Sequence, residues 1–231
     1  MATPAELPVP AEAIDRRARR RLETLEEILD IAEALLREEG VNGLSLSEVA
    51  RRLGVQPPSL YKYFPSQMAV YDALFERGQR ANTDAVLKAI AAAPPGLPAV
   101  IAGLEASGRW ALANQALAQL LFWRPLANFE PTAHAMEPGL EEFAELRRAL
   151  ADAVRLGQLG PGADSAEALH VAITLIAGAI VTAASNEPHL PWGEGRFSPL
   201  FPRLMALLPA LYPPAQARRS RTASTGSGSV K

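Results

Sequence analysis

The sequence predicts an all-α fold, on the basis of the spacing of its apolar residues and the lack of alternating apolar and polar segments. Apolar residues recur at spacings of three and four along most of the chain, and no series of segments alternates apolar with polar residues. The absence of cysteine excludes disulfides and thiolate metal sites, and it fits a reducing cytosol. With 48% hydrophobic and 21% charged residues among 231, we expect a soluble, cytoplasmic protein with one large or two small domains.

The amino-terminal segment, residues 1–15, holds several prolines and little periodicity, and we expect it to be disordered. It has no basic segment followed by an apolar run, so no secretory signal is expected. Five arginines follow within residues 16–21. A helical apolar stripe comes next and ends at Gly40. Its members are Leu22, Leu25, Ile28, Leu29, Ala32, Leu35 and Leu36.

A second, short helix is predicted to begin at Ser45, in capping-box register with Glu48. In such a box the serine hydroxyl accepts from the amide three residues on, and the carboxylate reaches back to the first amide. The helix is predicted to end at Gly54, because glycine readily adopts the left-handed backbone of a sharp turn. Its inward residues are Leu46, Val49, Ala50 and Leu53.

A third helix is predicted over residues 57–64, opened by two prolines whose fixed φ suits a first helical turn. Val55 and Leu60 are expected to complete a small core with the second helix. Pro65 and Ser66 then break the chain and cap a fourth helix, with Val70, Tyr71, Leu74 and Phe75 pointing inward. Two short helices joined by a tight glycine turn make a helix-turn-helix, whose second helix can enter the major groove of DNA.

The same segment resembles the DNA-binding domain of the TetR (tetracycline repressor) family. The resemblance rests on GVNGLSLSEVARRLGV at residues 40–55 and LYKYFPS at residues 60–66, and it extends over about residues 20–80. It implies a three-helix DNA-binding domain over 16–80, with the motif at about 45–64, and a helical effector-binding and dimerisation domain over 81–212. The implied function is a ligand-responsive repressor, acting as a homodimer on a palindromic operator in double-stranded DNA.

The resemblance also implies DNA contacts around the motif. Those expected on the DNA backbone or a thymine methyl are Ser45, Ser47, Arg51, Arg52, Ser59, Tyr61 and Tyr63. Those expected at base edges are Gln56, Pro57, Pro58 and Lys62. Gln67 stands where the family usually has lysine, and it keeps a hydrogen-bond donor without the charge. Phe64 is expected to pack inside the domain, and Tyr61 to share both roles.

The arginine-rich segment 16–21 has two interpretations. It is either an arm that lies on the flanking minor groove or DNA backbone, or a solvated helix face. The charge balance of residues 1–80, with 11 basic and 13 acidic side chains, gives no domain-wide attraction to DNA. That balance favours the alternative function, a helical small-molecule-binding protein that no longer reads DNA.

The second half begins after a Pro/Gly hinge at residues 94–98, and helices are predicted over 99–113, 116–123, 137–156, 165–185 and 198–211. Residues 99–136 are short of charges and rich in large apolar side chains, which is typical of cores and of ligand pockets. The resemblance favours a pocket for a small-molecule effector. Its candidate residues are Trp110, Phe122, Trp123, Phe129, His134 and Met136.

The last two predicted helices are apolar over most of their surface, so we expect them to pair with their copies across a two-fold axis. The most apolar stretch, residues 171–184, is shorter than the roughly 20 residues that span a bilayer, so we interpret it as a core helix and expect no membrane partner. Residues 213–231 are small, polar or basic and are expected to be disordered.

No motif indicates catalysis or a bound cofactor. The chain has no HExxH, GxSxG or phosphate-binding glycine loop, and a run of glutamates after residue 136 is expected to be a solvated helix face. The three histidines, His134, His170 and His189, lie far apart, and His170 is expected in the core. We therefore expect neither an enzyme nor a metal or cofactor site.

Overall fold

The computed structural model describes residues 11–215, with side chains from Arg16 onward, and every regular element in that range is a helix. The predicted all-α class is confirmed. The chain divides into two units, Met1–Leu74 and Phe75–Lys231, and the division falls inside one helix, α4 (Gln67–Ala92). The resemblance suggested a boundary at residue 80.

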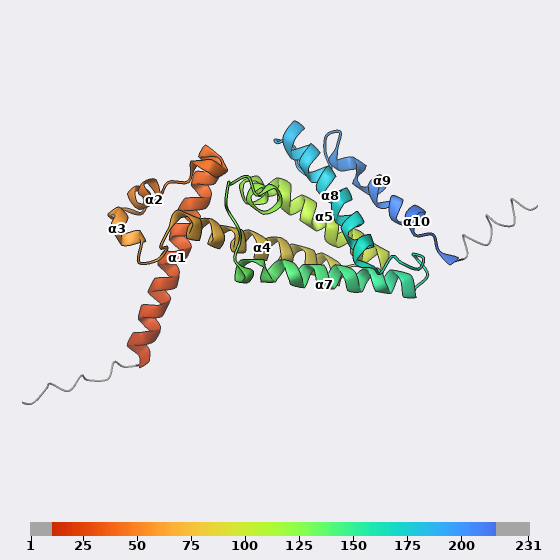
Figure 1. The fold of residues 1–231 in the computed structure, drawn as a ribbon, viewed down its shortest axis with the longest axis horizontal. Helices are drawn as coiled ribbons and strands as arrows, with labels where there is room; N and C mark the ends of the chain where they lie inside the picture. The colour runs from red at the N-terminus through yellow and green to blue at the C-terminus, as the bar shows by residue number, and fades with distance from the viewer. Residues whose placement is uncertain (1–10, 216–231) are drawn as a thin grey trace, which may run out of the picture. The chain divides into compact units, whose positions relative to one another are not determined.

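The first unit is built from α1, α2, α3 and the start of α4 (Figure 1). The bounds are Ala11–Glu39 for α1, Val41–Gly43 for the short 3₁₀-helix η1, Leu46–Leu53 for α2 and Pro57–Leu60 for α3. Residues 11–15 are helical, so the prediction that residues 1–15 are disordered is wrong for these five residues. Residues 1–10 lie outside the described residues.

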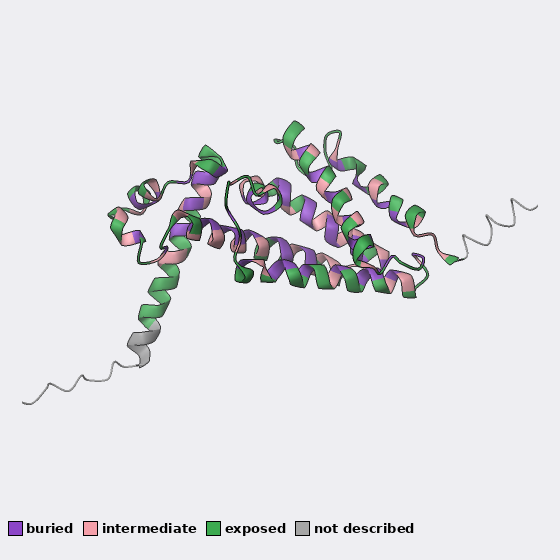
Figure 2. Cartoon of the chain, in the orientation of Figure 1, coloured by how far each residue is buried: buried purple, intermediate pink, exposed green. Residues whose placement is uncertain are grey.

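The apolar stripe of α1 is buried only in its second half. Ile28, Ala32 and Leu35 are buried, whereas Leu22, the first member of the stripe, is 62% exposed. The reason is geometric, because α2 and α3 cover the later turns of α1 and the earlier turns extend past them. Figure 2 colours these earlier turns as exposed. The arginines of residues 16–21 lie on this uncovered part, and all are exposed.

The core of the first unit joins the second half of α1 to α2, α3 and α4. Val49, Ala50 and Leu60 are buried as predicted, and α2 packs on both α1 and α3. Ser66 caps α4 by accepting from the Ala69 amide at 3.2 Å. The first turns of α4 then bury Val70, Tyr71 and Leu74, also as predicted.

The second unit contains the rest of α4 and the elements that follow it. Their bounds are Leu97–Ala113 for α5, Gln115–Ala118 for α6, Gln119–Trp123 for the π-helix η2, Ala133–Arg155 for α7, Ala166–Asn186 for α8, Ser198–Leu200 for the 3₁₀-helix η3, Phe201–Met205 for α9 and Leu207–Leu211 for α10. The central helix is α5, which packs against both α7 and α8. Residues 213–215 are described and 216–231 are not, so the tail expected to be disordered lies almost wholly outside the described residues.

Two predicted helices differ from those observed for local reasons. α7 begins before the predicted residue 137, because Thr132 accepts from the Ala135 amide at 3.2 Å and caps the helix there. The helix predicted over 198–211 is divided among η3, α9 and α10. Pro209 has no N–H to donate to the carbonyl four residues earlier, which explains the interruption between α9 and α10.

α8 combines a buried face with an exposed one. Ala172, Ile176 and Ile180 are buried against α5 and α7, as expected of a core helix. His170 is exposed, so its assignment to the core was wrong. By length and composition alone, α8 is long and apolar enough to cross a membrane, the one such helix among residues 11–215. Core packing accounts for the apolar residues on its buried face.

The Tyr71 hydroxyl generates a stability prediction, because it is buried and donates to the Val41 carbonyl at 2.7 Å. Tyr71→Phe removes this donor and leaves the buried carbonyl without it. We expect the free energy of unfolding to fall by about 1–2 kcal/mol in urea denaturation. The control is Tyr61→Phe, because Tyr61 is 56% exposed. An equal loss in both variants would contradict the prediction.

Candidate nucleic-acid interface and ligand cavity

The turn between α2 and α3 has the geometry that the sequence predicts. Gly54 adopts φ 75° and ψ 26°, the left-handed region, and its N–H donates to the Arg51 carbonyl at 3.2 Å. The Val55 N–H donates to the Ala50 carbonyl at 3.0 Å and closes the turn. A Cβ at position 54 would meet nothing within 4 Å, so the backbone conformation, not space, requires glycine here.

The amino-terminal cap of α2 is only half a capping box. The Ser45 hydroxyl accepts from the Glu48 amide at 3.4 Å, as predicted. The Glu48 carboxylate does not complete the box, because it accepts from Arg51 at 2.7 Å and from Arg52 at 2.9 Å. These charge-assisted bonds lower the pKa of Glu48 to about 2, so the carboxylate is ionised near neutral pH.

α3 is shorter than predicted and is held from one side. It ends at Leu60, and the Phe64 amide donates to the Leu60 carbonyl at 2.9 Å in the turn that follows. Leu60 and Phe64 are buried and anchor the segment, whereas Val55 is 37% exposed and does not join the small core expected of it. The opposite side of α3 and its turn faces solvent within this unit.

The residues predicted to contact DNA are accessible to different degrees. The exposed ones are Ser45, Ser47, Arg51, Arg52, Gln56, Pro58, Tyr61 and Lys62. The half-buried ones are Pro57, Ser59, Tyr63 and Gln67. Tyr61, expected to pack as well as to contact DNA, is 56% exposed, so its packing role is wrong. α3 and its turn thus display mainly polar and aromatic side chains.

Arg52 and Gln67 hydrogen-bond to other elements of the domain. Arg52 binds Glu38 of α1 through both terminal nitrogens, at 2.6 and 3.0 Å, and Glu48 of α2 through Nε. The Gln67 amide donates to the Leu44 carbonyl at 2.7 Å. Arg52 therefore braces α2 against α1, and Gln67 ties the start of α4 to the loop before α2.

A contact that the sequence did not reveal joins the basic part of α1 to the turn after α3. Arg21 donates to the Lys62 carbonyl at 3.3 Å, and its guanidinium lies 5.3 Å from the centre of the Tyr63 ring. The arginine cluster was visible in the sequence. Its partner, about 40 residues away, was not, because only the fold brings the two segments together.

The second unit contains a cavity of about 220 Å³ between α4, α5, η2, α7 and α8. Of the predicted effector residues, Phe122, Trp123 and Met136 line it. The other three do not. Phe129 is buried against the edge of Phe75, Trp110 packs edge-on against Phe122, and His134 is exposed beside Glu76 and Glu137.

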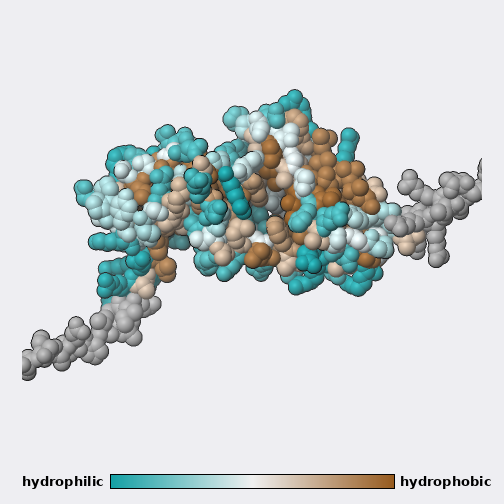
Figure 3. Space-filling view, in the orientation of Figure 1, coloured by the Kyte–Doolittle hydropathy of each residue, from teal (hydrophilic) through white to brown (hydrophobic). Residues whose placement is uncertain are grey.

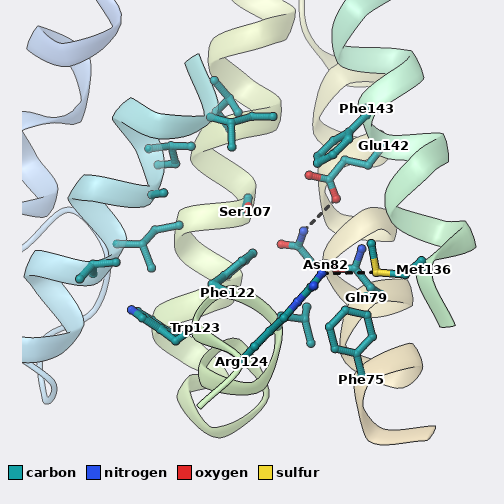
Figure 4. A pocket seen from close by; sticks show the side chains of 17 residues that line it. Phe75, Gln79, Asn82, Ser107, Phe122, Trp123, Arg124, Met136, Glu142 and Phe143 are labelled. Atoms are coloured by element: carbon teal, nitrogen blue, oxygen red, sulfur yellow. Dashed lines mark hydrogen bonds between the residues drawn. The ribbon is translucent and has the colours of Figure 1, made fainter. Parts of the chain in front are cut away.

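The polar part of the cavity wall centres on Glu142, which the sequence analysis assigned to a solvated helix face. This residue is 7% exposed. Its Oε2 accepts from Asn82 Nδ2 at 2.9 Å (Figure 4) and from Thr83 Oγ1 at 3.2 Å. Burial raises the pKa of Glu142 to about 7, although both hydrogen bonds act to lower it. Helical spacing groups Glu142 with its exposed neighbours, and only the packing of α7 on α4 separates them.

The cavity wall also contains irregular backbone. η2 is one turn of π-helix, and Arg124 follows it with φ 43° and ψ 58°, a left-handed conformation that is strained for a residue with a side chain. The Arg124 guanidinium lies 3.6 Å from Met136 Sδ and 5.7 Å from the centre of the Phe75 ring (Figure 4). Such features cluster at functional sites.

Part of the first unit is similar in sequence to known proteins. Residues 28–74 match the model of the bacterial regulatory proteins of the tetR family. Among curated relatives, this chain is 52% identical over 42 residues to tetracycline repressor protein class A of Escherichia coli, and 38% identical over 55 residues to a regulator of Bacillus subtilis, YobS. The matches cover 18% and 24% of this chain, and 19% and 29% of the length of those proteins.

Solved structures extend the likeness to most of the fold. A Rhodococcus protein of unknown function superposes with a TM-score of 0.68 at 25% identity, covering 81% of this chain and 94% of its own. The transcriptional regulator FadR from Bacillus subtilis, solved with stearoyl-CoA, superposes with a TM-score of 0.65 at 17% identity, covering 79% and 96%. The second likeness concerns the fold alone.

The raised pKa of Glu142 generates a prediction about pH. Because its folded-state pKa lies above the ordinary value of 4.5, its contribution to stability is complete below pH 4.5 and is lost as pH rises through 7. Glu142→Gln removes this loss. Relative to the parent, the variant should gain about 3 kcal/mol in unfolding free energy between pH 4 and pH 8, measured by urea denaturation. Glu141→Gln, at an exposed neighbouring position, should show no such gain.

Proposed function

We propose that this protein is a ligand-responsive transcriptional regulator that binds double-stranded DNA as a homodimer. The observation that carries the proposal is the outward side of α3 and its turn, held from behind by Leu60 and Phe64. It presents Gln56, Tyr61 and Lys62 to solvent in a helix-turn-helix whose sequence matches the tetR family. This exposure does not favour the alternative of a small-molecule-binding protein that no longer reads DNA.

The proposed contacts divide by chemistry. Gln56 and Lys62 present donors suited to base edges, and the prolines at 57 and 58 offer apolar contact. Ser45, Ser47 and Arg51 lie along α2, where hydroxyl and guanidinium groups suit phosphates. We assign Arg52 and Gln67 primarily to the domain's own architecture, because each binds a different element, Arg52 the Glu38 carboxylate of α1 and Gln67 the Leu44 carbonyl before α2.

The basic segment of α1 is proposed to add the phosphate attraction that the domain's overall charge lacks. Residues 16–21 are exposed and helical, so they would approach DNA as a rigid helix rather than as an extended arm. Arg21 links this helix to the turn after α3 through Tyr63 and the Lys62 carbonyl. Binding at the two places would therefore be coupled.

The dimer is proposed to form through α8, α9 and α10. Apolar side chains gather over these helices in Figure 3, and Val181, Leu200, Leu207 and Leu211 are each more than a third exposed. A contiguous apolar surface of this kind is typical of protein interfaces. Pairing of α8 and the α9–α10 segment with their copies would give the predicted two-fold interface.

The cavity is proposed as the effector site. It lies in a different unit from the helix-turn-helix, yet α4 belongs to both and lines the cavity with Phe75, Gln79 and Asn82. A ligand that binds one arrangement of α4 better than another would shift the population of DNA-binding conformers.

Lys62→Ala tests DNA recognition. A duplex selected from a random pool by the parent protein serves as the probe, and binding is followed by fluorescence anisotropy at 50 and 200 mM salt. We expect the variant to bind about tenfold more weakly, because it loses a donor or an ionic contact. Lys88→Ala, an exposed lysine outside the motif, should bind like the parent. Failure to select any duplex, or binding that does not weaken with salt, would refute the regulator.

Leu207→Glu tests the proposed dimer surface. Leu207 is 44% exposed on α10, and a carboxylate there would be buried without a partner in the interface. We expect sedimentation at micromolar concentration to shift from a dimer toward a species of 24.7 kDa. The matched control is Leu156→Glu, 46% exposed at the end of α7. A parent protein that sediments as a monomer would contradict the assignment.

A further inference from the structure

The cavity wall contains oxygen atoms that the described residues leave without donors. Asn82 is 2% exposed, and its Oδ1 is buried without a hydrogen-bond partner. Glu142 receives both of its hydrogen bonds at Oε2, which leaves Oε1 without a donor in the described part of the chain. Figure 4 shows these two side chains together on one wall, with the Ser107 hydroxyl on the neighbouring helix. A buried acceptor without a donor, such as Asn82 Oδ1, is costly, so this wall favours a ligand that donates.

The same wall contains a carboxyl group without a cation. The two groups that bind Glu142 are a neutral amide and a neutral hydroxyl. Around the cavity, α4 contributes Gln79 and Asn82 as polar residues, α5 contributes Ser107, and α8 contributes only apolar side chains. The other charged group that lines it, Arg124, contacts the Met136 sulfur and the Phe75 ring instead of Glu142.

The rest of the wall suits the apolar body of an organic cation. Phe122, Trp123 and Phe143 supply aromatic surface, and isoleucines of α8 supply aliphatic surface. Aromatic faces attract cations in addition to burying apolar groups. The volume of about 220 Å³ lies below the roughly 300–1,000 Å³ common for ligand pockets, which favours a compact ligand.

We infer that the cavity binds a compact organic cation, a protonated primary or secondary amine on an aromatic or branched apolar body. Its N–H groups would donate to Asn82 Oδ1 and Glu142 Oε1, and its charge would pair with the Glu142 carboxylate. The folded protein already holds this carboxyl group out of water, so binding adds only the desolvation of the amine. A carboxylic acid would place a second anion beside Glu142, and an alcohol would offer a single donor.

This inference rests on the proposed role of the cavity as an effector site, and three matched probes test it. Naphthylmethylamine, naphthylmethanol and naphthoic acid are each titrated into the full chain by calorimetry at pH 6 and pH 8. We expect the amine to bind at least tenfold more tightly than the other two at pH 8. Its affinity should fall about tenfold at pH 6, because Glu142, with a pKa of about 7, is then mostly protonated. The affinity for the alcohol should change little.

Two variants separate Glu142 from general charge effects. Glu142→Gln keeps the side-chain size, and it should remove the pH dependence and reduce amine affinity to that of the alcohol. Glu141→Gln makes the same change of charge at an exposed position on α7, and it should retain the parent behaviour. The pH series on the parent protein requires no variant, so it tests the inference even if Glu142→Gln fails to fold.

Several results would overturn the inference: equal or tighter binding of the alcohol or the acid, amine binding that does not depend on pH, or no binding of the amine at millimolar concentration. Duplex binding by the same preparations is measured separately. Amine binding with the expected pH profile but without duplex binding would refute the regulator and support the amine site. Duplex binding together with a preference for naphthoic acid would support the regulator and refute the amine site.

Discussion

The first unit depends on one backbone constraint, the left-handed turn at Gly54. The turn reverses the chain within two residues, so that Leu60 and Phe64 pack back toward α2 and the opposite side of α3 faces outward. A residue with a Cβ would have ample room there but would strain the backbone at φ 75°. Without this turn, α3 would have no anchored side, and its polar and aromatic residues would have no defined direction.

Ionic and amide contacts then make this small unit rigid. Arg52 connects α1 and α2 through Glu38 and Glu48, Gln67 connects α4 to the Leu44 carbonyl, and Arg21 connects α1 to the turn after α3. None of these side chains is deeply buried, so each contact contributes modestly to stability. Their joint effect is to fix the orientation of short elements that bury few residues of their own. A presented surface benefits from such preorganisation, because less freedom is lost on binding.

The second unit differs from the first, because its candidate site contains features that lower the stability of the fold. A carboxyl group with a raised pKa, an amide oxygen without a donor, a turn of π-helix and a strained arginine all lie around one cavity. Each of these lowers the stability of the fold, and together they leave polar groups whose interactions a ligand can complete. The surrounding packing of α5 against α7 and α8 is conventional and holds these features in place.

Local sequence determined much of the first unit, because its signals act over a few residues. Ser45, Gly54 and Ser66 each mark a cap or turn that the structure contains, and the inward positions of α2 and α4 follow from helical spacing. The tertiary structure decided the properties that depend on contact between distant segments. Packing alone distinguishes buried Glu142 from its exposed neighbours on α7. Packing also leaves Leu22 and His170 exposed, and it places Arg21 against Tyr63. Burial and partnership are set by what lies opposite a side chain, and the spacing of residues within one helix carries no information about that.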